Sequence, residues 1–176
     1  MVITIINNNM FHRYQLSFSE NVFNPLKDSS PLEFITTGRQ GGIIVQPKSY
    51  YKYTAKEKIP LIRSTSLYKK NPQKMEHIHQ EIINQIYKLS KIKNLYFNNA
   101  MVEIYDNRYC KMGWHTDLSL DLSEDSYIAL FSCYQYPDKV EGSKHCRKLV
   151  VKNKETNKTE TISMLHNSVI LFSYQQ

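Results

Sequence analysis

Two histidine-x-carboxylate triplets are the residues in this 176-residue sequence whose types and spacing could bind a metal ion. They are HQE at residues 79–81 and HTD at residues 115–117. His79 and Glu81 lie in a segment with helical periodicity, where side chains two positions apart do not face each other. His115 and Asp117 follow Gly113 in the β-rich half, where residues two apart point to the same face of a strand. The sequence therefore predicts that His115 and Asp117 can converge on one ion.

A histidine and a carboxylate supply two of the three ligands of the facial triad that holds Fe(II) in non-haem oxygenases. The triad leaves neighbouring coordination positions open for a cosubstrate and dioxygen. The sequence contains no HExxH zincin motif, no zinc deaminase signature, no GxSxG elbow and no phosphate-binding glycine loop. The alternative for the triplet is a surface histidine beside a turn aspartate, and the triplet alone leaves both interpretations open.

Most of the elements that must position these residues are predicted strands. Apolar or alternating runs separated by turn residues predict strands at 2–6, 43–46, 101–105, 126–134, 147–152, 159–163 and 168–173. The spacing of apolar residues predicts one helix at 72–92, with Pro72 in its first turn. Residues 24–31 predict a turn-rich loop. Strands that follow one another after a single helix predict an antiparallel sandwich or barrel, buttressed by that helix.

Composition places the chain among globular proteins. Hydrophobic residues make up 41% of the sequence and aromatic residues 12%, which excludes a mostly disordered chain. The length favours a single domain over residues 1–176. Three cysteines without CxxC spacing indicate reduced thiols, and no secretory signal or membrane-length apolar run is visible. We therefore expect an intracellular protein, cytoplasmic or nuclear, with no membrane partner.

The formal net charge of +7 permits an anionic partner such as nucleic acid. However, the sequence has 18 lysines and 5 arginines, whereas bidentate recognition of phosphates and bases favours arginine. Tyrosines and lysines alternate over residues 50–60, which suits either a surface for single strands or an amphipathic strand. Charge alone leaves nucleic-acid binding and a biased composition as alternatives.

The run FNNAMVEIYDNRYCKMGWHTD, residues 97–117, resembles AlkB-type 2-oxoglutarate- and Fe(II)-dependent dioxygenases. Those proteins carry a Phe-Asn pair, a strand that ends in Tyr, and then Trp-His-x-Asp. The corresponding residues here are Phe97, Asn98, Tyr105, Trp114, His115 and Asp117. The strands predicted at 126–134 and over 147–173 also resemble the family's later strands, so the resemblance covers residues 97–173.

The resemblance implies a mainly β (α+β) fold, a double-stranded β-helix or jelly roll with helix 72–92 as its N-terminal buttress. His115 and Asp117 would bind Fe(II), and the hydroxyl of Tyr105 would reach a carboxylate of 2-oxoglutarate. With dioxygen, such a site would hydroxylate an N-alkyl carbon of alkylated DNA or RNA and release formaldehyde from a flipped base. Two other functions stay open: a prolyl or lysyl hydroxylase of the same fold, and a non-catalytic β-sandwich binding module.

The sequence departs from the family pattern in two places. Glu103 stands where the family has an asparagine, and its carboxylate would repel an anionic cosubstrate unless it is protonated or turned away. The family's third ligand and its 2-oxoglutarate-binding arginine follow the strand at 168–173, so the C-terminal strands with both residues are expected to be missing. His166 is a substitute ligand, against a role as a turn histidine. We expect Ile170 and Phe172 to be poorly covered at an unpaired edge, with self-association, weak Fe(II) binding and little or no turnover.

Overall fold

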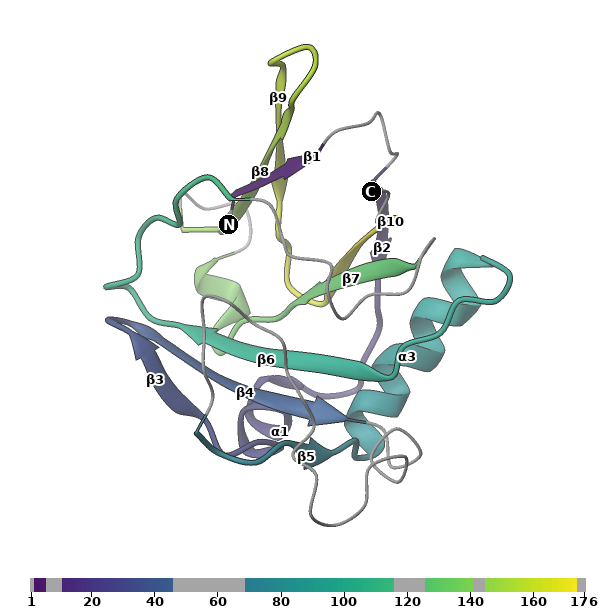
Figure 1. Ribbon diagram of the computed structural model, residues 1–176. Coiled ribbons are helices and arrows are strands. Elements are labelled where there is room, and N and C mark those ends of the chain that lie inside the picture. The colour runs from purple at the N-terminus through teal and green to yellow at the C-terminus, as the bar shows by residue number, and fades with distance from the viewer. Residues whose placement is uncertain (1, 6–10, 46–68, 116–125, 141–144, 174–176) are drawn as a thin grey trace. The chain divides into compact units, whose positions relative to one another are not determined.

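The computed structural model describes residues 2–5, 11–45, 69–115, 126–140 and 145–173, and most of its elements are strands (Figure 1). The strands are β1 (Val2–Ile5), β2 (His12–Gln15), β3 (Glu33–Thr36), β4 (Arg39–Val45), β5 (Gln73–Lys74), β6 (Asn99–Tyr105), β7 (Tyr127–Ser132), β8 (Lys148–Asn153), β9 (Thr159–Ser163) and β10 (Ser168–Ser173). The helices are α1 (Phe23–Asp28), α3 (His77–Ser90) and the 3₁₀ turn η1 (Pro137–Lys139). The predicted mainly β character is confirmed.

The chain divides into two compact units, each assembled from segments that are far apart in the sequence. The β10 unit contains Met1–Phe23, Gln85–Leu95 and Lys111–Gln176, and the β4 unit contains Asn24–Asn84 and Tyr96–Cys110. The segment that carries the family resemblance therefore belongs to both units. Its first part, through Cys110, lies in the β4 unit, and the histidine of the HTD triplet lies in the β10 unit.

In the β4 unit, strand β4 is the centre of a four-stranded sheet. Antiparallel β6 runs along its full length, from Arg39 opposite Tyr105 to Val45 opposite Asn99. Strand β3 pairs with the beginning of β4, and β5 pairs in parallel with its end. A β-carbon at Gly42 would collide with the side chain of Ser30, so the absence of a side chain there lets the segment after α1 lie against the sheet.

Helix α1 occupies most of the segment that was predicted to be a turn-rich loop, so that prediction is wrong for residues 24–28. The side-chain oxygen of Asn21 accepts a hydrogen bond from the backbone N–H of Phe23 at 3.0 Å and caps the helix. Pro25 stands in the first turn, where a missing N–H removes no helical hydrogen bond. The residues that suggested a turn are the residues that begin and end a short helix.

Helix α3 confirms the predicted helix but begins later than expected, at His77. Pro72 is not in its first turn, because the two residues that follow it extend along β4 as β5. The backbone N–H of Glu76 donates to Nδ1 of His79 at 2.9 Å and caps the helix at its actual start. The predicted apolar face is buried at Ile82, Ile83 and Ile86. No helix among the described residues is long and apolar enough to span a membrane.

The β10 unit contains two three-stranded sheets. One has the order β2-β10-β7 and is antiparallel, and the other has the order β1-β8-β9, in which β1 runs parallel to β8. Side chains from β8, β9 and β10 form one buried cluster, which consists of Leu149, Val151, Ile162, Ile170 and Phe172. The two sheets of this unit therefore share one core.

Strand β10 is the central strand of its sheet, and the expected poor coverage of Ile170 and Phe172 is wrong. The two side chains are 2% and 3% exposed, and the ring of Phe11 lies 5.4 Å from that of Phe172 between centroids. The reason is that β2, from the N-terminal part of the chain, pairs with one edge of β10 while β7 pairs with the other. This pairing removes the structural ground for expecting self-association.

Candidate active site

The antiparallel pairing of β4 and β6 brings three polar side chains to one face of the sheet. Arg39 lies opposite Tyr105, and Gly41 lies opposite Glu103. Because Gly41 has no side chain, the long side chain of Arg39 can cross diagonally to its neighbour on β6. The Nη2 atom of Arg39 lies 2.8 Å from Oε1 of Glu103, and the hydroxyl of Tyr105 donates a hydrogen bond to Oε2 of Glu103. Two donors from different strands thus converge on one carboxylate.

Burial and charge fix the protonation of this cluster. The side chains of Arg39 and Glu103 are 13% and 12% exposed. Burial acts to lower the pKa of Arg39, but the Glu103 carboxylate and a hydrogen bond from Tyr109 raise it above its ordinary value. Burial, together with the negative charge of Glu103, raises the pKa of Tyr105, so its hydroxyl keeps its proton. The cluster is therefore a paired cation and anion beside a neutral phenol.

The turn between β3 and β4 places Arg39 at the end of β6. Gly38 has a φ of 76°, and a β-carbon there would meet the carboxylate of Asp106 and lie 2.7 Å from the backbone nitrogen of Tyr109. The backbone N–H of Asp106 donates to the carbonyl of Gly38 at 2.8 Å. The ring of Tyr109 also lies near the guanidinium of Arg39, 6.0 Å from its Cζ to the centroid. Only glycine permits this close approach of the turn and the residues after Tyr105.

His115, the first residue of the predicted metal pair, has a defined tautomer. Its Nδ1 lies 3.0 Å from the carbonyl oxygen of Gly113. A carbonyl oxygen only accepts hydrogen bonds, so Nδ1 carries the proton and Nε2 carries the lone pair. This arrangement is the usual one for a metal-binding histidine, whose second nitrogen donates to a carbonyl or carboxylate. The other half of the pair, Asp117, lies outside the described residues, so its approach to His115 stays a prediction.

His166 lies in the turn before β10 and has the opposite tautomer. Its Nδ1 accepts a hydrogen bond from the backbone N–H of Tyr134 at 3.0 Å, so the neutral ring carries its proton on Nε2. While this bond holds, neither ring nitrogen offers a lone pair to a metal. The hydroxyl of Tyr134 donates to the carbonyl of Met164 at 2.6 Å and accepts from the N–H of Arg147 at 3.1 Å. Burial raises the pKa of Tyr134 to about 12, so this contact joins strands and does not bind a metal ion.

The other sequence candidates lie elsewhere. His79 and Glu81 both lie in α3, as predicted, and Nε2 of His79 makes a 3.0 Å hydrogen bond with the hydroxyl of Ser29. Within the described ranges, no group of three or more His, Cys, Asp or Glu side chains is arranged to hold a metal ion. The tyrosine- and lysine-rich stretch at 50–60 lies outside the described residues.

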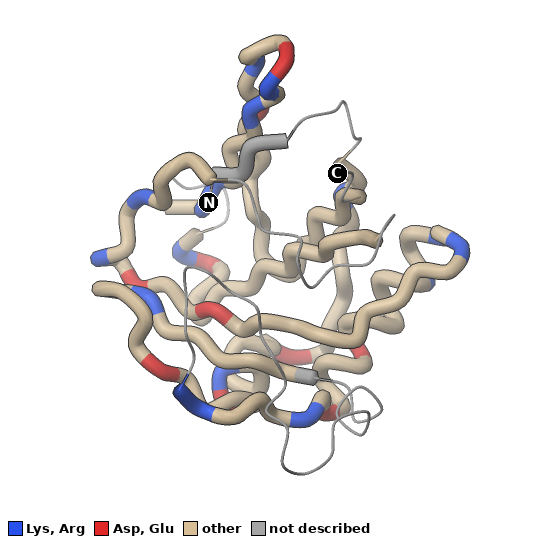
Figure 2. Tube along the Cα trace, in the orientation of Figure 1, with Lys and Arg blue, Asp and Glu red and all other residues tan. Residues whose placement is uncertain are grey.

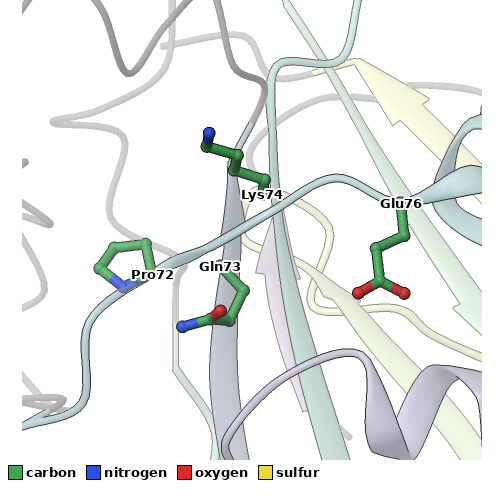
Figure 3. A pocket seen from close by; sticks show the side chains of 4 residues that line it. All are labelled: Pro72, Gln73, Lys74 and Glu76. Atoms are coloured by element: carbon green, nitrogen blue, oxygen red, sulfur yellow. The ribbon is translucent and has the colours of Figure 1, made fainter.

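A pocket in the β4 unit lies apart from this cluster. Its lining comes from the segment between β5 and α3 and consists of Pro72, Gln73, Lys74 and Glu76 (Figure 3). Strand β5 pairs with the end of β4, whereas Arg39 is the first residue of β4. The pocket is therefore at the other end of the sheet from the Arg39–Glu103 pair.

Comparison with protein-family models, with curated proteins and with solved structures found no match. The site described above thus depends on the chain's own residues. Sequence analysis did not single out Arg39, although an arginine between Gly38 and a predicted strand is a weak signal in a chain with 5 arginines. Its partner is set by the pairing of β4 with β6, which the sequence pattern does not reveal.

Proposed function

We propose that this chain is an AlkB-type Fe(II)- and 2-oxoglutarate-dependent dioxygenase that removes alkyl groups from nucleic-acid bases. In this proposal His115 and Asp117 bind the metal, and Tyr105 contacts a carboxylate of 2-oxoglutarate. The observation that carries the proposal is the hydrogen bond from Nδ1 of His115 to the carbonyl of Gly113. It puts the lone pair of the ring on Nε2, as binding of a first-row metal requires.

The arrangement of strands supports the finer part of the proposed fold. A jelly roll consists of two antiparallel sheets packed face to face. In the β10 unit, β2-β10-β7 and β1-β8-β9 contribute side chains to one core. Strand β6 ends at Tyr105, where the resemblance expects a strand to end. We therefore include a double-stranded β-helix in the proposal.

The chain's residues bind and orient in this proposal. When bound, iron and 2-oxoglutarate would supply the oxidation of the N-alkyl carbon. Tyr105 keeps its proton and can donate a hydrogen bond to a carboxylate. Trp114, next to His115, is 52% exposed and offers a face on which an unpaired base can stack. Lysines and arginines are spread over the described segments among acidic residues, so we expect stacking to contribute more than a single basic patch (Figure 2).

The proposal is tested by succinate formation from 2-oxoglutarate in the presence of Fe(II) and dioxygen. Two assigned ligands hold a metal less tightly than three, so we expect slow turnover that depends on both of them. His115→Ala and Asp117→Ala should each abolish Fe(II)-dependent succinate formation, whereas His77→Ala, at an exposed position on α3, should retain it. Equal succinate formation by wild type and His115→Ala would overturn the proposed metal site.

A further inference from the structure

Arg39 and Tyr105 already form a carboxylate-binding pair, and the carboxylate that they bind belongs to the chain itself. One oxygen of Glu103 lies 2.8 Å from Nη2 of Arg39, and the other accepts the hydroxyl hydrogen of Tyr105. A guanidinium is the cation best suited to a carboxylate, because its planar fork can bind both oxygens. The ring of Tyr109, 6.0 Å from Cζ of Arg39, further restricts the orientation of the guanidinium.

We propose that Arg39 is the cationic anchor for a carboxylate of the dicarboxylate cosubstrate, and that Glu103 occupies this anchor until the cosubstrate displaces it. The inference rests on the proposed function, which brings a dicarboxylate to Tyr105. It also assigns a role to Glu103, whose charge would otherwise oppose an anionic ligand. The chain then carries its own cationic anchor on β4.

Charge balance makes this an exchange and not an addition. With Glu103 in place, the cluster contains one cation, one anion and a neutral phenol. A second carboxylate at Arg39 would add an unpaired negative charge to a site with little exposure, where charges interact more strongly than in water. The ligand therefore has to replace Glu103, and the side chain of Glu103 competes with every carboxylate that enters.

The competition predicts effects of opposite sign for the two partners. Titration calorimetry of the full chain with 2-oxoglutarate, in the presence of Mn(II), measures the affinity without turnover. Arg39→Gln should weaken binding by about 10- to 100-fold, as expected for a lost charge-assisted hydrogen bond. Glu103→Gln should tighten binding by about tenfold, because the amide no longer repels the ligand or holds Arg39 as firmly. Arg39→Lys should fall between, since it keeps the charge but not the fork.

Two further variants separate this role from a purely structural one. Arg108 pairs with Asp106 at the surface nearby, so Arg108→Gln is the matched control and should bind 2-oxoglutarate as the wild type does. Removing one partner of a buried ion pair leaves the other charge unpaired and destabilises the fold. The double variant Arg39→Gln/Glu103→Gln carries neither charge, and we expect it to be folded by circular dichroism and to bind as weakly as Arg39→Gln.

The outcomes distinguish this inference from the proposed function. If the wild type binds 2-oxoglutarate and the double variant binds it equally well, or if Glu103→Gln binds more weakly, Arg39 is not the anchor and the proposed function stands. If the wild type does not bind 2-oxoglutarate with Mn(II), both are overturned. Weaker binding by Arg39→Gln and the double variant, together with tighter binding by Glu103→Gln, supports both.

Discussion

At the scale of single residues, the partner of one ring nitrogen decides what each histidine can do. Nδ1 of His115 donates to a carbonyl, so Nε2 has the lone pair. Nδ1 of His166 and of His79 instead accepts a backbone N–H, which places the ring proton on Nε2 of each. The same residue type therefore serves a candidate metal site in one case and a turn or a helix start in the others.

The buried His79 makes folding stability depend on pH. Burial lowers the pKa of His79 below its ordinary value of 6.5, because a charged ring would be desolvated and would point Nδ1–H at the N–H of Glu76. The unfolded chain therefore binds a proton more readily than the folded chain does. The free energy of unfolding should be constant above about pH 6.5 and should decrease as the pH falls below it toward the lowered pKa.

Urea unfolding of the wild type and of His79→Gln, at about pH 7.5 and about pH 5.5, measures this dependence. The wild type should lose more stability than His79→Gln between the two pH values. His77→Gln, at an exposed position on the same helix, should lose as much as the wild type. An equal loss in the wild type and His79→Gln would show that His79 does not titrate on unfolding.

At the scale of elements, local patterns predicted strands better than helix boundaries. Strands β9 and β10 match the predicted ranges 159–163 and 168–173 residue for residue, because turn residues border both runs. Helix α1 was missed because Asn, Pro and Ser favour turns and helix ends alike, and the choice depends on whether Asn21 caps the next residues. The start of α3 was placed too early because pairing with β4 extends the residues after Pro72.

Strand pairing is the part of the fold and of the site that the pattern could not supply. The resemblance singled out Tyr105, and the charge of Glu103 was recognised as a conflict. Its resolution needs Arg39, which is distant in the sequence and becomes a neighbour only through the register of β4 with β6. In the same way, coverage of β10 depends on β2, which the sequence pattern did not indicate as a strand.

The central position of β10 predicts a large effect of core truncation. Ile170 is almost fully buried, so Ile170→Ala should lower the free energy of unfolding by about 2–5 kcal/mol in urea titrations. Leu165, which is 43% exposed, is a control in the turn before β10, and Leu165→Ala should cost about 0.5 kcal/mol or less. Similar losses in the two variants would contradict the assignment of β10 as a buried central strand.

At the scale of the whole molecule, the two halves of the proposed site belong to separate compact units. His115 belongs to the β10 unit, and the Arg39–Glu103 pair with Tyr105 belongs to the β4 unit. Metal binding and carboxylate binding can therefore be tested by substitutions in different units. The net charge of +7 agrees with an anionic substrate but does not identify one, since lysine supplies most of it.

Formaldehyde release from a methylated single-stranded oligonucleotide tests the proposed dealkylation most directly. With the full chain, Fe(II), 2-oxoglutarate and dioxygen, we predict formaldehyde release that is absent with the unmethylated oligonucleotide and with His115→Ala. Consumption of 2-oxoglutarate without formaldehyde would contradict base dealkylation and favour a protein hydroxylase. The absence of any Fe(II)-dependent reaction would contradict the dioxygenase and leave a non-catalytic binding module.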